Sequence, residues 1–200
     1  LAEYHQAFAS QPARQHAIEL FELLERHARD PAHAGYFEVC SRDWSSVLDE
    51  PLSERDLIEK KSMNSHLHVL EAYTNLFRAW NDPRVAARLR ELIQLFEERI
   101  LDPRTHHLQH FFDEQWRVRS DSYTFGHDIE ASWLLCEAAE TLADHALLER
   151  VRHTALRLAE SVLTEALADD GGLAYEGRAG RLMDPRRECR SEERRVGKEC

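Results

Sequence analysis

The side chains best suited to acid–base chemistry are His127 and Glu130, within the segment Tyr-Thr-Phe-Gly-His-Asp-Ile-Glu at residues 123–130. Gly126 marks the entry from a loop into a helix, so we expect His127 in the first turn and Glu130 on the same face. A carboxylate there can fix the imidazole tautomer and leave the other nitrogen to take or give a proton. The alternative is a His–Glu pair that only closes a helix end. Asp128 projects elsewhere and is a candidate cap for the helix N-terminus.

A second polar group follows one stripe of the preceding predicted helix. Asn64, His68, Glu71 and Asn75 are spaced four, three and four residues apart, which places them on one face of an otherwise apolar helix. A buried polar stripe needs hydrogen-bond partners or a wet cavity, because unpaired buried polar groups are costly. The stripe therefore indicates that this helix borders a pocket.

The remaining histidines do not have the spacing of a metal site. His66 and His68 are two residues apart on one predicted helix, so their side chains point about 200° away from each other. His106, His107 and His110 add imidazoles without a recognisable ligand triad. We therefore expect no metal site.

Trp44 and Trp116 fall in predicted loops on the side of the expected pocket. Sugars stack on indole rings, so either residue could be a carbohydrate platform, and the alternative is that both belong to the core. The sequence shows no nucleophile elbow and no phosphate-cradling glycine loop. A carboxylate pair for glycoside hydrolysis cannot be identified from the sequence either.

Helical periodicity dominates the chain and predicts an all-α fold. The five predicted helices span about residues 14–29, 61–80, 83–101, 126–143 and 146–168. Asp82 is a predicted N-cap, because Pro83 follows it at the first helical position.

Three irregular segments resemble one another, at residues 35–38, 107–110 and 172–176. Each follows a long helix and introduces a short extended run, and a pair of helices separates each from the next. This is a helical repeat, which could be an open solenoid or a toroid of helix hairpins with short β-hairpin loops. The helices at 61–80 and 126–143 are apolar around much of their circumference, which favours inner helices of a toroid.

Composition excludes several classes of protein. The formal net charge of −11 over 200 residues argues against nucleic-acid binding and against docking on anionic lipid. No apolar run is long enough to span a membrane. The four cysteines (Cys40, Cys136, Cys189 and Cys200) are scattered, which is typical of reduced thiols in a cytoplasmic protein.

The last eleven residues, 190–200, read RSEERRVGKEC. Back-translated, they match a common sequencing adapter, so we exclude them from fold reasoning as read-through. The chain also starts with Leu1 rather than Met. We therefore expect residues 1–188 to be the central portion of a single catalytic domain, truncated at both ends.

Residues 61–80 (KSMNSHLHVLEAYTNLFRAW) and 122–135 (SYTFGHDIEASWLL) resemble signature segments of the cellobiose 2-epimerases, within the N-acylglucosamine 2-epimerase superfamily. Residues 170–188 (DGGLAYEGRAGRLMDPRRE) resemble the stretch that follows in that family. The resemblance covers nearly all of residues 1–188. It implies part of an (α/α)6 barrel about twice as long as this chain.

The resemblance also implies reversible epimerisation at C2 of the reducing-end sugar of a β-1,4-linked disaccharide, without a cofactor. Cellobiose would give glucosyl-mannose and lactose would give epilactose, through ring opening and a cis-enediolate. By motif match, His127 is a base and Glu130 orients it. His68 would assist ring opening, and Asn64 would bind substrate.

The sequence departs from the family where a tryptophan pair would begin, since Cys189 stands there. The family's second catalytic histidine and an N-terminal arginine have no match in this chain, so we expect the fragment itself to be inactive. The alternatives are a monosaccharide epimerase or isomerase of the same superfamily, a non-catalytic helical-repeat scaffold, and an (α/α)6 glycoside hydrolase.

Overall fold

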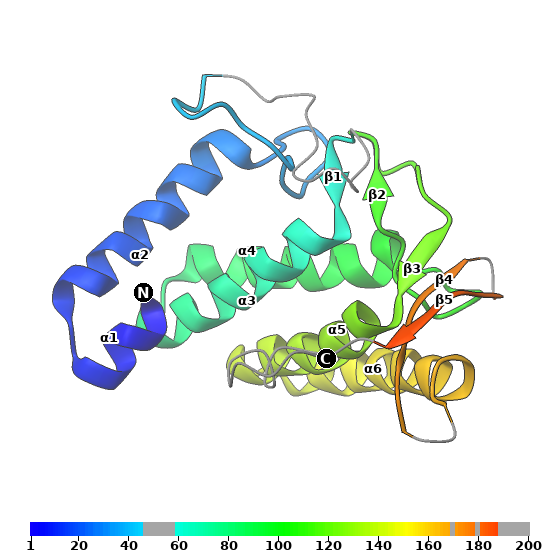
Figure 1. The fold of residues 1–200 in the computed structure, drawn as a ribbon. Helices are drawn as coiled ribbons and strands as arrows, with labels where there is room; N and C mark the ends of the chain where they lie inside the picture. Colours follow the sequence, from blue (N-terminus) through cyan, green and yellow to red (C-terminus); the bar gives the residue numbers. More distant parts are fainter. Residues whose placement is uncertain (46–58, 169–170, 179–180, 188–200) are drawn as a thin grey trace.

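The computed structural model describes residues 1–45, 59–168, 171–178 and 181–187 (Figure 1). The segment interpreted as adapter read-through, together with Cys189 and Cys200, lies outside these residues.

Six α-helices account for most of the described chain: α1 (Ala2–Phe8), α2 (Gln11–Leu23), α3 (Met63–Ala79), α4 (Pro83–Leu95), α5 (Phe125–Thr141) and α6 (His145–Glu165). A π-helical turn extends α2 over Leu24–Ala28 and another extends α4 over Phe96–Ile100. The five predicted helices are confirmed, whereas the short α1 was not predicted. Asp82 is confirmed as the N-cap of α4, because its carboxylate accepts from the Arg84 amide at 2.8 Å.

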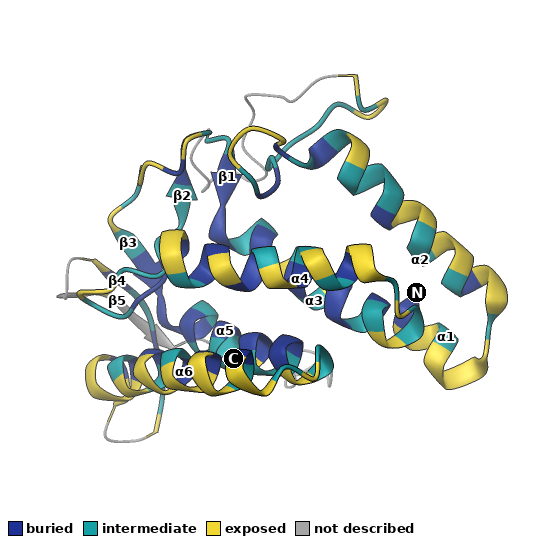
Figure 2. Ribbon diagram, turned by 180° about the vertical axis from the view of Figure 1, so that it is seen from behind, coloured by how far each residue is buried: buried dark blue, intermediate teal, exposed yellow. Residues whose placement is uncertain are grey.

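The helices form two layers. In Figure 1, α3 and α5 lie side by side in front of α4 and α6, and in the reverse view of Figure 2 the outer helices α4 and α6 come to the front with exposed faces. Leu67 and Leu70 of α3 and Leu134 and Leu135 of α5 are almost completely buried. Burial of such side chains stabilises the layer by about 1.5–3 kcal/mol each. This arrangement confirms the predicted inner position of the helices at residues 61–80 and 126–143.

Short strands gather at one end of the helices, away from α1 (Figure 1). β1 (Lys61–Ser62) pairs antiparallel with β2 (Phe111–Phe112) and runs directly into α3. β3 (Ser122–Thr124), β4 (Ala174–Arg178) and β5 (Arg181–Arg187) form a three-stranded antiparallel sheet, and β3 runs directly into α5. The two sheets therefore fix the starting points of both inner helices.

The predicted repeat is visible in the loop that follows each of α2, α4 and α6. An isolated antiparallel bridge closes each loop, between Arg29 and Tyr36, Leu101 and Leu108, and Leu167 and Leu173. In the first two loops the predicted extended runs form only this bridge, whereas the third continues into β4. The repeating unit is thus an outer helix, a bridged turn and a strand leading into the next inner helix.

Candidate functional site

A cavity of about 430 Å³ lies where the inner helices begin. Its volume falls in the range of small-molecule sites. The cavity is lined from α3, α5, both sheets and the loops between them by Glu38, Ser62, Met63, Asn64, His110, Phe111, Ser122, Thr124, His127, Tyr175 and Glu176. Imidazole, carboxylate, amide and phenol groups therefore converge on one space.

His127 lies in the first turn of α5, as its position after Gly126 predicted. Its Nδ1 is 2.5 Å from Oγ1 of Thr124, the residue that ends β3 and precedes the helix. The sheet register positions this hydroxyl, because Thr124 pairs with Glu176 across β3 and β4. The partner that holds Nδ1 of His127 is thus a hydroxyl from the adjacent strand.

His110 is the second imidazole of the cavity. Its ring lies edge-on to that of His127, with centroids 6.0 Å apart and planes at 80°. Nε2 of His110 accepts from the Thr124 backbone amide at 3.1 Å. Burial, reinforced by the charge that His127 acquires on protonation, lowers the pKa of His110 to about 4. His110 is therefore neutral at physiological pH.

Carboxylates and an amide complete the polar lining. Glu38 accepts a short hydrogen bond from the hydroxyl of Ser62, the N-cap of α3. Asn64 follows in the first turn of that helix, and Glu176 enters from β4. Groups that donate and accept hydrogen bonds on several sides of one cavity suit a ligand rich in hydroxyls.

A buried ionic network lies behind the cavity. Asp128 Oδ2 is 2.7 Å from His107 Nδ1, and His107 Nε2 is 3.2 Å from Glu165 of α6. The His107 ring stacks on that of Tyr123 with centroids 3.9 Å apart. The interpretation of Asp128 as an N-terminal cap is wrong, because its other oxygen accepts from the Leu108 amide at 2.9 Å. Asp128 therefore ties α5 to the preceding loop rather than to its own N-terminus.

The first repeat contains a matching contact. His66 Nε2 accepts from the Tyr36 amide at 2.9 Å, and its Nδ1 lies 2.6 Å from the Ser62 carbonyl. Tyr36 and Leu108 occupy the same place in the bridged turns of their repeats. In both repeats a buried acceptor in the first turns of the inner helix holds the amide that closes the loop.

Burial dominates the pKa shifts of these two acceptors, whereas the carboxylates beside His107 dominate that of the imidazole. Desolvation lowers the pKa of His66 to about 4 and raises that of Asp128 to about 6. Burial by itself would lower the pKa of His107, but the hydrogen bond and charge of Asp128, supported by Glu165, outweigh it and raise the pKa.

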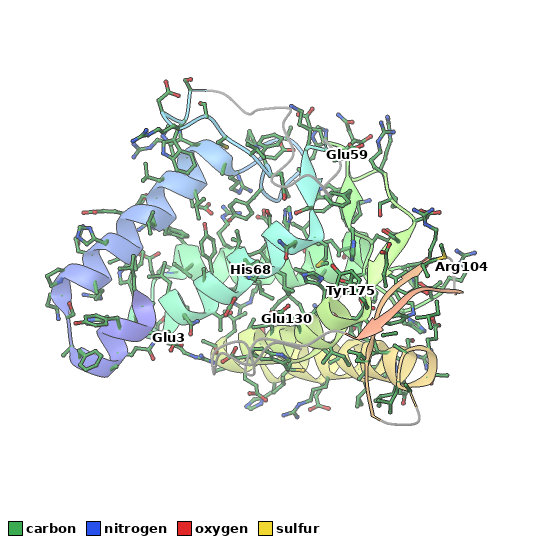
Figure 3. The ribbon with its side chains drawn as sticks, in the orientation of Figure 1. Glu3, Glu59, His68, Arg104, Glu130 and Tyr175 are labelled. Carbon is green, nitrogen blue, oxygen red and sulfur yellow. The ribbon has the colours of Figure 1, made fainter. Side chains whose placement is uncertain are left out.

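The residues singled out from the sequence do not all meet at one point. Asn64 and His127 line the same cavity. His68 lines a second groove of about 400 Å³ formed by α1, α2 and α3, together with Trp44. Figure 3 places His68 on α3 and Glu130 on α5. The polar stripe of α3 is thus divided, with Asn64 at the cavity and His68, Glu71 and Asn75 in the groove.

Trp116 lies in the core, which corrects its interpretation as a carbohydrate platform. The residue is only 7% exposed, and its Nε1 donates to the His33 carbonyl at 2.9 Å. The Lys61 ammonium lies 4.8 Å from the ring centroid. Trp44 is half-buried beside His27, with ring centroids 5.7 Å apart.

Sequence reasoning did not identify His110, Glu38 or Tyr175 as cavity residues. Glu38 and His110 follow the bridged turns of the first and second repeats, and Tyr175 follows that of the third. Each of these residues lies two positions after the second residue of its bridge. An alignment of the three repeated segments would therefore have identified Glu38, His110 and Tyr175 from the sequence.

Within the part of the chain that the structure describes, one group of possible metal ligands comes together at Asp30, His33 and Glu114, with ligand atoms within 4.8 Å of one another. Lys61 Nζ donates to Asp30 Oδ2 at 2.7 Å, and both side chains are buried. The buried ammonium of Lys61 thus neutralises the Asp30 carboxylate. We therefore assign this cluster to stabilisation of the first bridged loop.

None of the described helices combines the length and apolar character needed to cross a bilayer.

Comparison with known proteins gives concordant results. A family model described as N-acylglucosamine 2-epimerase (GlcNAc 2-epimerase) matches residues 1–190. A Bacteroides fragilis protein called cellobiose 2-epimerase is 45% identical over 176 residues, which cover 88% of this chain and 45% of the relative.

Solved structures share the fold. The cellobiose 2-epimerase of Bacillus thermoamylovorans B4167 superimposes with a TM-score of 0.84 at 35% identity, over 90% of this chain and 46% of that one. The enzyme of the same name from Spirochaeta thermophila DSM 6192 gives a TM-score of 0.81 at 39% identity, over 93% and 46%. The chain therefore spans less than half the length of these proteins, and its helix hairpins correspond to part of their (α/α)6 fold.

Proposed function

The chain belongs to the N-acylglucosamine 2-epimerase family, and from this premise we propose that the complete protein containing it epimerises C2 of the reducing-end sugar of β-1,4-linked disaccharides. The observation that carries the proposal is the shared cavity of His127 and Asn64. Relatives named cellobiose 2-epimerase, at up to 45% identity, support cellobiose as the first substrate to test.

The proposed reaction begins with opening of the reducing-end ring to an aldehyde. His127 removes the proton from C2 as the C–H electron pair forms a C1–C2 double bond, and the negative charge passes to the aldehyde oxygen. Because Nδ1 of His127 is held by Thr124, we assign the proton transfer to Nε2. Glu130, on the same helix, is proposed to orient and support the imidazole.

Inversion requires a proton to return to the opposite face of C2. We assign that second acid–base group to the part of the relatives that this chain does not cover. On this basis residues 1–188 alone are expected to be inactive. The proposed route uses side chains only and assigns no step to a cofactor.

The substrate would extend along the polar stripe of α3. Asn64 is proposed to bind the reducing-end sugar, and His68, about one helical turn further along, to assist ring opening. His68 Nδ1 lies 3.3 Å from Glu71, so a carboxylate already supports this imidazole. Trp44 lines the same groove as His68 and is the proposed stacking surface for the second sugar.

The test is to express the complete gene and incubate the protein with cellobiose, mannose and N-acetylglucosamine in separate reactions in heavy water. The proposal expects glucosyl-mannose carrying one deuterium at C2. Turnover of mannose or N-acetylglucosamine without cellobiose would assign the protein to a sister activity. Release of glucose would indicate a hydrolase, and absence of any product would favour a scaffold.

A further inference from the structure

His110 is the second imidazole of the cavity and has no role in the reaction described so far. It belongs to the loop before β2, and its backbone carbonyl accepts from the Met63 amide at 2.8 Å, at the start of α3. Its side chain lines the cavity beside His127. The residue is thus fixed to the starts of both inner helices, through Met63 at the first position of α3 and through Thr124, which directly precedes α5.

The contact with Thr124 determines which nitrogen of His110 carries the proton. A backbone amide can only donate, so Nε2 of His110 must accept and cannot hold a proton in the neutral ring. The proton of neutral His110 is then on Nδ1. The fold therefore presents a neutral imidazole with one defined N–H donor at the cavity.

We propose that His110 is a catalytic residue whose Nδ1–H donates a hydrogen bond to the substrate oxygen that becomes negative when His127 removes the C2 proton. This inference rests on the proposed function. The proton stays on His110 throughout, while the one taken from C2 moves to His127. A preorganised donor aimed at developing oxyanion charge is among the strongest contributions to catalysis of this kind.

The surroundings of the two imidazoles favour His127 as the base and His110 as the neutral hydrogen-bond donor. The rings are 6.0 Å apart at their centroids, close enough for a positive His127 to disfavour a second positive ring. Burial acts in the same direction and lowers the pKa of His110 to about 4. His110 therefore stays neutral when His127 becomes charged, and a neutral imidazole serves as a hydrogen-bond donor rather than as a competing base.

The competing explanation is that His110 only braces Thr124. Two substitutions separate the explanations, because asparagine places an amide near the position of Nδ1 and glutamine places one near Nε2. H110Q keeps an acceptor for the Thr124 amide and loses the Nδ1 donor. H110N keeps a donor near Nδ1 and loses the acceptor for Thr124.

Both variants are tested in the complete protein with cellobiose, and melting temperatures are recorded alongside. The proposal expects H110Q to lower kcat by about 100-fold with little change in KM, and H110N to retain activity within about tenfold of wild type. Wild-type kcat in H110Q, or an H110N as impaired as H110Q, overturns the inference. A wild-type protein without epimerase activity overturns the proposed function, and this inference with it.

A measurement on the unsubstituted protein covers the case in which the variants fail to fold. In protein labelled with nitrogen-15 at histidine, the resonances of His110 should report a neutral ring protonated at Nδ1 at physiological pH. A proton on Nε2, or a charged ring, overturns the inference whatever the variants do. This readout does not require turnover, so it is independent of substrate choice.

Discussion

Asp128 and His107 lie 2.7 Å apart in the interior, and their contact immobilises the residue that follows His127. Both side chains are almost completely excluded from solvent. Asp128 also accepts from the Leu108 amide, so one carboxylate binds a side chain and a backbone group of the same loop. The loop that carries His110 is thereby anchored to the helix that carries His127.

Replacing Asp128 with alanine should destabilise the chain by about 3–5 kcal/mol, because it leaves the His107 imidazole and the Leu108 amide buried without their partner. Urea unfolding followed by circular dichroism measures the loss. The matched control is R152A, which removes an exposed partner of Glu149 at 3.0 Å and should cost about 0–1 kcal/mol. Equal losses in the two variants would contradict a structural role for the Asp128 contact.

The same network should make stability depend on pH. The folded pKa of Asp128 is raised from 3.8 to about 6, and that of His107 is raised above 6.5. Both groups hold a proton more tightly in the folded state, so their contribution is complete below the unfolded pKa values and is lost as pH rises through the folded ones.

The free energy of unfolding of wild type relative to D128N should therefore fall from about pH 4 to about pH 6, as Asp128 titrates, and fall further as pH rises through the raised pKa of His107. Subtracting D128N removes the contribution of the other carboxylates, whose protonation is common to both proteins. A difference that stays flat over this range, or that grows with pH, would contradict the assigned shifts.

Two glycines with left-handed backbone conformation provide a test of the first loop. Gly35 has φ of +75°, and a Cβ there would come within 2.5 Å of both His66 Nε2 and the Trp116 ring. G35A should therefore cost roughly 2–4 kcal/mol, from backbone strain together with overpacking. Gly171 has φ of +83° and open space around it, so G171A should cost only about 1–2 kcal/mol.

Thermal unfolding of the two alanine variants side by side provides the comparison. If G171A is as destabilised as G35A, the close packing of Trp116 and His66 against Gly35 contributes nothing, and backbone conformation alone explains both results.

Helical spacing was enough to predict the inner helices and the polar stripe that begins at Asn64, whereas Asn64 and His127 share a cavity because α3 packs against α5. A spacing of three or four residues fixes which side chains share a face, whatever the loops do. Spacing could not predict that His110 would meet His127, because their approach depends on the register of β3 with β4 and on a loop closed by Asp128.

The same limit explains the errors. Asp128 fits the composition of an N-terminal cap, but its partner is an amide twenty residues earlier in the chain. Trp116 lies in a loop, and loops are usually exposed. Its ring is nevertheless buried, because it packs against the Lys61 ammonium and against Gly35. In both cases a long-range contact outweighed the local preference.

Substitution of His127 by glutamine in the complete protein should lower kcat on cellobiose by about 10²–10⁴-fold, because a general base is lost. Deuterium uptake at C2 in heavy water should fall in parallel. The control is H153Q on α6, which replaces an exposed histidine away from the cavity and should leave both rates unchanged. Preserved exchange in H127Q would assign the proton abstraction to another group.

The hydroxyl of Thr124 gives the most specific prediction for the site, since its contact at 2.5 Å sets the orientation of His127. T124V keeps the β-branched shape that suits the end of β3 but removes the hydrogen-bonding oxygen. We expect kcat to fall about five- to tenfold, the loss that corresponds to one hydrogen bond of about 1 kcal/mol or slightly more. T124S restores the oxygen and should recover most of that loss, even though it removes the methyl group. If T124S is as slow as T124V while both melt near wild type, the methyl group and not the hydroxyl positions His127, and the proton must be held on the imidazole by a different partner.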